Sequence, residues 1–430
     1  MKDMHIDVHY LTRVEGHANI VVNTSNGVID ELRLEIIEAP RFFESMLLGK
    51  SYYDVAQITC RICGICAVGH TLASLRGTED ALGITPSEQT VLLRKLILDA
   101  ETIQSHVLHD YFLVAPDFFG VGSVLPLAAS HPDVVKRALR LKKLANDMCV
   151  TIGGRPVHPI SLVPGGFTHI PTASELLAIK QRILDAVPDL QATVDLFKTL
   201  PIPAFDNPTE YVALKSDVEY AFYDGDIASS DGWRVRPQEY LDRIKERVVQ
   251  HSSCKHVGAV RPNFMVGALA RFNLNYLQLH PMAAVAAKEL GLTGPSTNSF
   301  MISVAQLVEA IHAAEDSLTI IDELLRRGLK DEPLAPPTRH GRGVGAVEVP
   351  RGLLIHDYTY DEQNRITANN LIIPTTMNMA NIEFDMRDLV PRLLQADKSQ
   401  SEITLALEML TRAYDPCISC SVHMLHVTFV

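Results

Sequence analysis

The stretch Arg61-Ile-Cys63-Gly-Ile-Cys66 holds two thiols three positions apart, and the same spacing recurs in Asp415-Pro-Cys417-Ile-Ser-Cys420. This spacing lets a single turn of chain present two sulfurs to one ion. The two pairs lie more than 350 positions apart, so distant segments must come together for them to meet. We therefore expect the four thiolates to form one metal site that closes a large domain from both ends.

Spacing alone leaves several kinds of site open. A structural tetrathiolate zinc, an iron-sulfur cluster and two unrelated redox pairs all use cysteines at this separation. Structural zinc sites usually take their ligands from a short local segment, unlike these pairs. A thioredoxin-like redox pair needs a βαβ context, whereas the sequence around these cysteines has helical periodicity.

Size and charge limit the class of protein. The chain has 430 residues, of which 47% are hydrophobic and 21% charged, as in a globular protein with a large core. Its net charge of -12 argues against nucleic-acid or anionic-membrane partners, because phosphate binding needs clustered Lys and Arg. Residues 1–10 lack an apolar signal segment, and no later apolar run is long enough to span a membrane. We expect a cytoplasmic chain.

Hydrophobic periodicity predicts a mainly α chain with α+β decoration. Apolar and polar residues alternate in 18–22 and 28–37 around the turn signal Asn26-Gly27, which predicts a β-rich part within residues 1–40. Helical spacing of apolar residues appears in 87–114, 133–151, 173–200, 237–250, 304–327 and 401–412. Segments rich in Gly and Pro are predicted site loops at 153–166, 333–350 and 371–381. Without repeats or long linkers, residues 1–430 are predicted to form a single domain around a bundle of long helices.

Both cysteine motifs resemble the signatures of nickel-iron hydrogenase large subunits. His70 follows the first pair by four residues, and His423 closes the second motif. Further family-like segments occur in the same order: Arg13-Val-Glu15-Gly-His17, Arg41-Phe-Phe-Glu44, Gly153-Gly-Arg-Pro-Val-His158-Pro, Pro350-Arg351-Gly352 and Pro374-Thr375-Thr376. The resemblance covers nearly the whole chain. It implies the large-subunit fold and a catalytic subunit that reversibly cleaves dihydrogen into protons and electrons.

The resemblance also implies the ligands of a nickel-iron centre. Nickel would be bound by four thiolates, those of Cys63, Cys66, Cys417 and Cys420. The second cysteine of each pair, Cys66 and Cys420, would also bridge to an iron that carries carbon monoxide and cyanide. Soft thiolates suit nickel in general.

Other residues would surround this centre. Pro374, Thr375 and Arg351 match the residues that hold the diatomic ligands, and Arg351 would lie over the open face of the metals. A proton released from dihydrogen would pass through Cys417 to Glu15. Catalytic roles are therefore expected for Glu15, Arg351 and Cys417.

Glu44 and His423 resemble the ligands of a magnesium ion. Three histidines are either donors near the thiolates or ordinary core histidines: His70, His106 and His158. The remaining cysteines have no partner spacing and are interpreted as small buried hydrophobes: Cys60, Cys149 and Cys254. In most of the family an endopeptidase trims the chain after the final histidine, so the extension Met424–Val430 indicates an unprocessed precursor or a lineage that keeps its tail.

Partners follow from the same resemblance, which is nearest to cytoplasmic multimeric hydrogenases of the methyl-viologen-reducing or bidirectional-like type. All paired cysteines are used at nickel, so electrons would leave through an iron-sulfur small subunit and further flavin or iron-sulfur subunits. A hydrogen-sensing regulatory hydrogenase would keep the same ligands. A structural zinc protein remains the plain alternative, whereas the quinone-site subunits of respiratory complex I have lost the metal cysteines.

Overall fold

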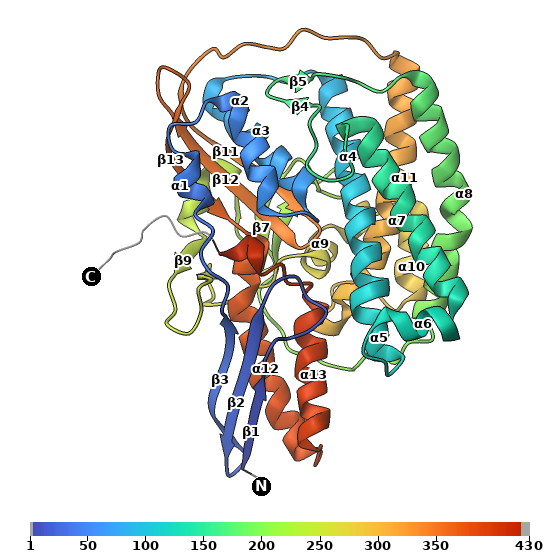
Figure 1. Cartoon of the computed structure of the whole chain (residues 1–430), viewed down its shortest axis with the longest axis vertical. Helices are drawn as coiled ribbons and strands as arrows, with labels where there is room; N and C mark the ends of the chain where they lie inside the picture. Colours follow the sequence, from blue (N-terminus) through green and yellow to red (C-terminus); the bar gives the residue numbers. More distant parts are fainter. Residues whose placement is uncertain (1–2, 423–430) are drawn as a thin grey trace.

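The computed structural model describes residues 3–422, and about half of these residues are helical. Four long helices lie side by side on one side of the molecule (Figure 1): α4 (Glu88–Leu108), α7 (Pro132–Gly153), α8 (Ala173–Phe197) and α11 (Ile302–Arg327). α4 packs against α7 and α11, and α8 also contacts both of them. The predicted bundle of long helices is confirmed. Every helix within residues 3–422 is too short or too polar to cross a lipid bilayer.

The remaining helices lie outside this bundle, and some of them flank the cysteine motifs. The N-terminal half contributes α1 (Phe43–Leu47), α2 (Tyr52–Thr59), α3 (Ala67–Leu82), α5 (Ala115–Phe118) and α6 (Val124–Ser130). The C-terminal half contributes α9 (Ala268–Asn275), α10 (Pro281–Glu289), α12 (Pro374–Gln395) and α13 (Gln400–Ala413). A capping box starts α13, in which the Ser399 side chain and Glu402 each satisfy a backbone N–H of the other.

The predicted β-rich opening is confirmed as an antiparallel sheet in the order β1 (Met4–Val8), β2 (Ala18–Ser25), β3 (Val28–Ile36). Asn26 and Gly27 both take positive φ, as the tight turn between β2 and β3 requires. The sheet lies at one end of the molecule, beside α12 and α13 (Figure 1).

A larger sheet and the helix that follows it replace much of two predicted loops. Its order is β11 (Gly341–Val349), β12 (Gly352–Tyr360), β13 (Ile366–Ile372), so residues 341–349 of the segment 333–350 form a strand. The segment 371–381 also contains the first turns of α12, for which Pro374 supplies a preset φ at the first helical position. Smaller sheets join β4 (Leu162–Val163) to β5 (Gly166–Phe167), β9 (Lys245–Arg247) to β10 (His256–Gly258), and β6 (Val212–Lys215) to β7 (Asp226–Ser229) and β8 (Arg234–Val235).

The predicted helix at 237–250 is wrong. Only Pro237–Asp242 forms a 3-10 helix, and Lys245–Arg247 is strand β9. Tyr240 and Ile244 are buried at helical spacing in a second, smaller core between the sheets, which explains the apparent periodicity. The next apolar position, Val248, is 72% exposed, because pairing with β10 has replaced the helix.

Glycine lets α3 lie directly on β11. A Cβ at Gly345 would overlap the Ala73 carbonyl oxygen and the Gly77 amide nitrogen, and one at Gly343 would overlap the backbone of α3 at Ala81. On the helix side, a Cβ at Gly69 would overlap the side chain of Val349. The helix that starts beside Cys66 is therefore seated on the strand by direct backbone contact.

We expect Gly345→Ala to lower the free energy of unfolding by about 1–3 kcal/mol, because its methyl group must push α3 away from β11. Urea unfolding of the reduced chain measures this loss. Gly122→Ala is the matched control, since a Cβ there meets no atom within 4 Å. Equal stability of the two variants would contradict the close contact.

Candidate metal centre

Three of the four paired cysteines lie beside or within a helical element. Cys63 directly follows the 3-10 helix Cys60–Ile62, and Cys66 is the residue before α3. Cys417 forms an isolated bridge with the N-terminal segment, and Cys420 lies in the 3-10 helix Ser419–Ser421. All four are buried, with exposures of 5% or less.

The structure brings the two pairs together. Cys63 Sγ lies 3.6 Å from Cys417 Sγ across 354 positions of sequence. The sulfurs of Cys63, Cys66 and Cys420 all lie within 4.8 Å of one another. Cys417 and Cys420 are joined as a disulfide, so both must be reduced before they can act as thiolate ligands.

The local backbone stabilises a thiolate at Cys63. Its Sγ accepts the N–H groups of Ile65 at 3.2 Å and Cys66 at 3.3 Å. A hydrogen bond from the Cys66 side chain, with help from nearby Arg351, lowers the pKa of Cys63 to about 7. The same hydrogen bond, with burial, raises the pKa of Cys66. Within the first pair, ionisation is therefore favoured at Cys63 over Cys66.

Glu15 lies against the second pair. Its Oε2 is 3.3 Å from Cys417 Sγ and accepts the Ser419 N–H at 3.0 Å. Its carbonyl accepts the Ile418 N–H at 2.9 Å, which makes a parallel bridge between residues 15 and 417. The carboxylate predicted as proton acceptor is therefore next to the sulfur predicted as proton donor.

Asp415 fixes the Arg351 side chain near the cysteine cluster. Arg351 Nε donates to the Asp415 carbonyl at 2.7 Å and its Nη2 to Oδ1 at 2.8 Å, with both side chains 2% exposed. Nη1 is buried and has no hydrogen-bond partner within residues 3–422. A buried unpaired donor of this kind is suited to a polar or anionic ligand at the site.

The first turn of α12 contacts the second cysteine motif. The Cys417 N–H donates to Thr375 Oγ1 at 3.0 Å, and Pro374 is the first residue of the helix. Thr375 is buried at this helix N-terminus, where backbone N–H groups lack intrahelical partners. Both residues predicted to face the diatomic ligands are thus at the cysteine cluster.

Glu44 is buried in α1, with Oε1 accepting the Leu371 N–H at 3.0 Å. Burial raises its pKa to about 7, although that hydrogen bond opposes the shift. A bound cation would compensate the buried charge. His423, the predicted second magnesium ligand, and the extension 424–430 lie outside the described residues.

The three uncertain histidines each have a partner in the protein. His70 Nδ1 lies 3.2 Å from His356 Nε2, His106 Nε2 lies 2.8 Å from Glu309, and His158 Nδ1 lies 2.9 Å from the Cys60 carbonyl. Such contacts are typical of core histidines, as His70 and His106 are, whereas His158 is only partly buried. The cysteines interpreted as hydrophobes are all free and buried, as predicted: Cys60, Cys149 and Cys254.

Sequence reasoning missed Glu101. Its two oxygens accept the N–H groups of Val68 at 2.6 Å and Gly69 at 2.9 Å, so it anchors the start of α3 behind Cys66. Burial raises its pKa to about 8. Glu101 sits in the long helix α4 without any motif around it, so only the fold could identify it.

Asp385 was missed for the same reason. On α12 it accepts hydrogen bonds from Ser299 Oγ at 2.5 Å, Tyr414 OH at 2.5 Å and Asn207 Nδ2 at 2.7 Å. Tyr414 immediately precedes Asp415, so this carboxyl ties α12 to the second motif. Burial raises the pKa of Asp385 to about 6.

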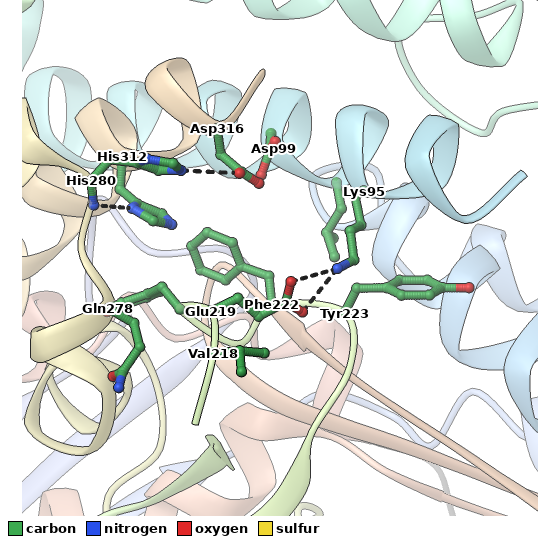
Figure 2. A pocket seen from close by; sticks show the side chains of 12 residues that line it. Lys95, Asp99, Val218, Glu219, Phe222, Tyr223, Gln278, His280, His312 and Asp316 are labelled. Carbon is green, nitrogen blue, oxygen red and sulfur yellow. Dashed lines mark hydrogen bonds and ion pairs between the residues drawn. The ribbon is translucent and has the colours of Figure 1, made fainter. Parts of the chain in front are cut away.

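A separate cavity of about 200 Å³ lies beside α4 and α11 (Figure 2). His280 faces Asp316 across 3.1 Å at one end, and Lys95 pairs with Glu219 at 2.6 Å at the other. None of the predicted site residues within 3–422 lines it. The hollow is therefore distinct from the buried cysteine cluster.

Comparison with known proteins agrees with this geometry. The family model described as nickel-dependent hydrogenase matches residues 41–135 and 207–423, which include both cysteine pairs. The chain is 34% identical to sulfhydrogenase 1 subunit alpha of Pyrococcus furiosus, over 99% of this chain and 100% of that protein. It is 31% identical to the NAD-reducing hydrogenase HoxS subunit beta of Cupriavidus necator, over 96% of this chain and 94% of that protein. A solved NAD+-reducing NiFe-hydrogenase in the H2-reduced state has a TM-score of 0.87 at 27% identity, covering 98% of this chain and 99% of its own.

We expect Asp385→Asn to change the pH dependence of stability. Because the folded pKa is raised from 3.8 to about 6, the protonated carboxyl favours the fold below about pH 4, and this contribution is lost as the pH rises through 6. The amide does not titrate, so the free energy of unfolding of the variant relative to wild type should rise by up to about 3 kcal/mol over this interval. Urea unfolding of the metal-free, reduced chain at stepped pH measures it.

Ser299→Ala is the control, because it removes one donor and keeps the carboxyl group. The free energy of unfolding of Ser299→Ala should still fall between pH 4 and 6, as it does in wild type. That of Asp385→Asn should lack this fall. Parallel pH curves for wild type and Asp385→Asn would show that this group does not titrate as inferred.

Proposed function

The chain belongs to the nickel-dependent hydrogenase family as a catalytic large subunit, and from this premise we propose that its four paired cysteines hold the nickel-iron centre. The family's enzymes are oxidoreductases that act on dihydrogen. The observation that carries the assignment is the 3.6 Å approach of Cys63 Sγ to Cys417 Sγ from opposite parts of the sequence. Cys66 and Cys420 complete the ligand set at the same place.

The residues present fit such a centre. Thiolates are soft ligands suited to nickel, and four of them lie in one buried cluster. In our assignment Cys66 and Cys420 would also hold the iron. The unpaired Nη1 of Arg351 and the start of α12 at Pro374 and Thr375 are the donors available to carbon monoxide and cyanide ligands.

The chain's own task is to accept the proton from dihydrogen cleavage. When bound, the nickel-iron centre polarises dihydrogen, which is otherwise nonpolar and barely acidic. We assign Cys417 as the group that first holds the proton and Glu15 as the next acceptor, supported by their 3.3 Å contact. Arg351, fixed by Asp415, keeps a positive charge near Cys63 and Cys66.

We propose a magnesium ion at Glu44 as a second, structural metal. A buried carboxylate of raised pKa gains most from a hard cation that prefers oxygen ligands. His423 is the partner expected from the sequence. Glu44 also receives the Leu371 N–H from β13, so an ion here would hold α1 near the sheet that leads into α12.

As the large subunit of a heteromeric hydrogenase, the chain works with a small subunit and other partners. We propose that the small subunit carries iron-sulfur clusters, because all paired cysteines here are used at the nickel site. Flavin or iron-sulfur subunits would then pass electrons to a soluble acceptor. The cytoplasmic location and the single domain over residues 1–430 stay predictions. So do the two interpretations of residues 424–430, an unprocessed precursor or a lineage that keeps its tail.

A regulatory hydrogen sensor would keep the same ligands, and a structural zinc protein would fill the thiolates differently. Infrared spectroscopy with metal analysis of the purified complex distinguishes these alternatives. Carbonyl and cyanide stretches with about one nickel per chain support a hydrogenase centre. Turnover of dihydrogen then separates the enzyme from the sensor, while zinc without these stretches would refute the proposal.

We expect Cys420→Ser to lose nickel and the infrared bands, since a hydroxyl cannot replace a thiolate shared by two metals. Cys149→Ala is the control, because this free cysteine is buried in α7 and belongs to neither pair. It should keep nickel near the wild-type level. A wild-type nickel content together with a wild-type rate of dihydrogen turnover in Cys420→Ser would remove Cys420 from the ligand set.

We expect Glu15→Gln to keep nickel yet slow hydrogen-deuterium exchange by at least about 100-fold, because an amide cannot take up the proton. The exchange is followed by mass spectrometry of the gas phase. Glu38→Gln serves as the control, since Glu38 pairs with exposed His17 in the same part of the chain. Unimpaired exchange in Glu15→Gln would exclude Glu15 from the proton path.

A further inference from the structure

A cluster of two histidines and one glutamate lies outside the cysteine site. His251 belongs to the loop after β9, His256 begins β10, and Glu383 lies on α12. One ligand atom from each lies within 4.8 Å of the other two. Because Glu383 is 132 positions from His251, only the packing of β10 against α12 brings them together.

Glu383 keeps one carboxylate oxygen available. Its Oε1 accepts the Leu34 N–H of β3 at 3.0 Å and lies 2.8 Å from His251 Nε2. Both contacts end on the same oxygen, so Oε2 can bind a cation while Oε1 keeps the Leu34 N–H. If His251 binds the ion through Nε2, the ion replaces the hydrogen bond from His251 to Oε1. The bond to β3 also restricts the rotation of the carboxylate.

His256 is buried without a matching partner. It is 4% exposed, and its Nε2 has no hydrogen-bond partner within residues 3–422. Leaving such a polar atom unpaired in a protein interior costs about 1–3 kcal/mol. Its ring packs edge to face against His251, with centroids 5.5 Å apart. An ion bound between the rings would supply the partner that His256 Nε2 lacks.

An ordinary ion pair accounts for only part of this arrangement. It explains the contact between His251 and Glu383, whose side chains are 20% and 12% exposed. It does not explain the third residue, His256, or its unpaired nitrogen. A metal ion would use all three side chains, and the partly exposed edge at His251 gives water access to a fourth position.

We propose that His251, His256 and Glu383 bind a zinc ion, separate from the nickel-iron centre. Two neutral imidazoles and one carboxylate form a common zinc ligand set with one open position. Ligand atoms about 2.0–2.1 Å from tetrahedral zinc lie about 3.3 Å from one another. The three ligand atoms here lie within 4.8 Å of one another, so they must approach by at most about 1.5 Å to bind zinc. Small side-chain rotations provide this change.

The ion would tie the β9–β10 hairpin to α12. Glu383 is eight residues after Thr375, which places it about 12 Å further along the helix that starts at the cysteine cluster. The site would thus act on the position of the helix without contributing a ligand to nickel. Zinc occupancy of this site can be measured without an assay of hydrogenase activity.

The test is zinc binding by the nickel-loaded complex. The protein is incubated with zinc chloride, passed through gel filtration and analysed for metals, and X-ray absorption at the zinc edge identifies the ligand atoms. We expect one zinc per chain with nitrogen and oxygen neighbours. Sulfur neighbours alone would mean that zinc occupies only the cysteine site, and no retained zinc would mean that the cluster is an ion pair; either result overturns the proposal.

Substitutions locate the site. His256→Asn and Glu383→Gln should each lower zinc affinity at least about 100-fold, since each removes a direct ligand. The side-chain amide oxygen introduced by Glu383→Gln can still accept the Leu34 N–H, so this variant is expected to fold, and circular dichroism checks it. His280→Gln removes a comparable partly buried histidine paired with Asp316 and should bind zinc as wild type does. Equal affinity in all variants would refute the assignment.

Discussion

The direct backbone contact between α3 and β11 sets the geometry on which the rest of the site depends. At Gly343 and Gly345 the strand has no side chain, so the backbones of helix and strand meet directly there. Cys66 immediately precedes the helix, and Arg351 follows the strand by two residues, so this contact fixes the distance between a sulfur and the guanidinium that stabilises thiolate charge. Glu101 holds the first turn of the same helix from behind. The contact is steric, so it keeps these groups in place whether or not an ion is present.

The second cysteine motif is held by hydrogen bonds from three different parts of the chain. Glu15 binds it from the N-terminal segment, Thr375 from the start of α12, and Arg351 through Asp415. Asp385 adds support one residue upstream through Tyr414. A loop with so many fixed points loses little further freedom when it takes up metal, which favours binding. The same arrangement buries charges and carboxyl groups, which destabilise the fold when their partners are missing.

Much of the site could be predicted because its residues lie in short motifs, as with Cys63, Cys417 and Glu15. The long helices of the bundle could also be predicted, since their apolar residues recur at helical spacing over many turns. The sheet β11–β13 could not, because glycines needed for close packing give a loop-like sequence. At 237–250 two buried residues have the spacing of a helix. The segment nevertheless pairs as a strand with β10. Glu101, Asp385 and the His251 cluster depend on tertiary neighbours alone, and no local pattern marks them.

The bridge between residues 15 and 417 has a consequence for synthesis of the chain. The 354 positions between Cys63 and Cys417 take roughly 20–70 s to translate at usual ribosomal rates. During that interval the first thiols have no partner sulfurs, and the segment around Glu15 lacks the strand residue that it pairs with. The nascent protein must therefore shield a reactive cysteine pair before the pocket can close. Any factor that delivers metal earlier would meet only half of the ligands, so the order of translation itself makes metal loading a late event.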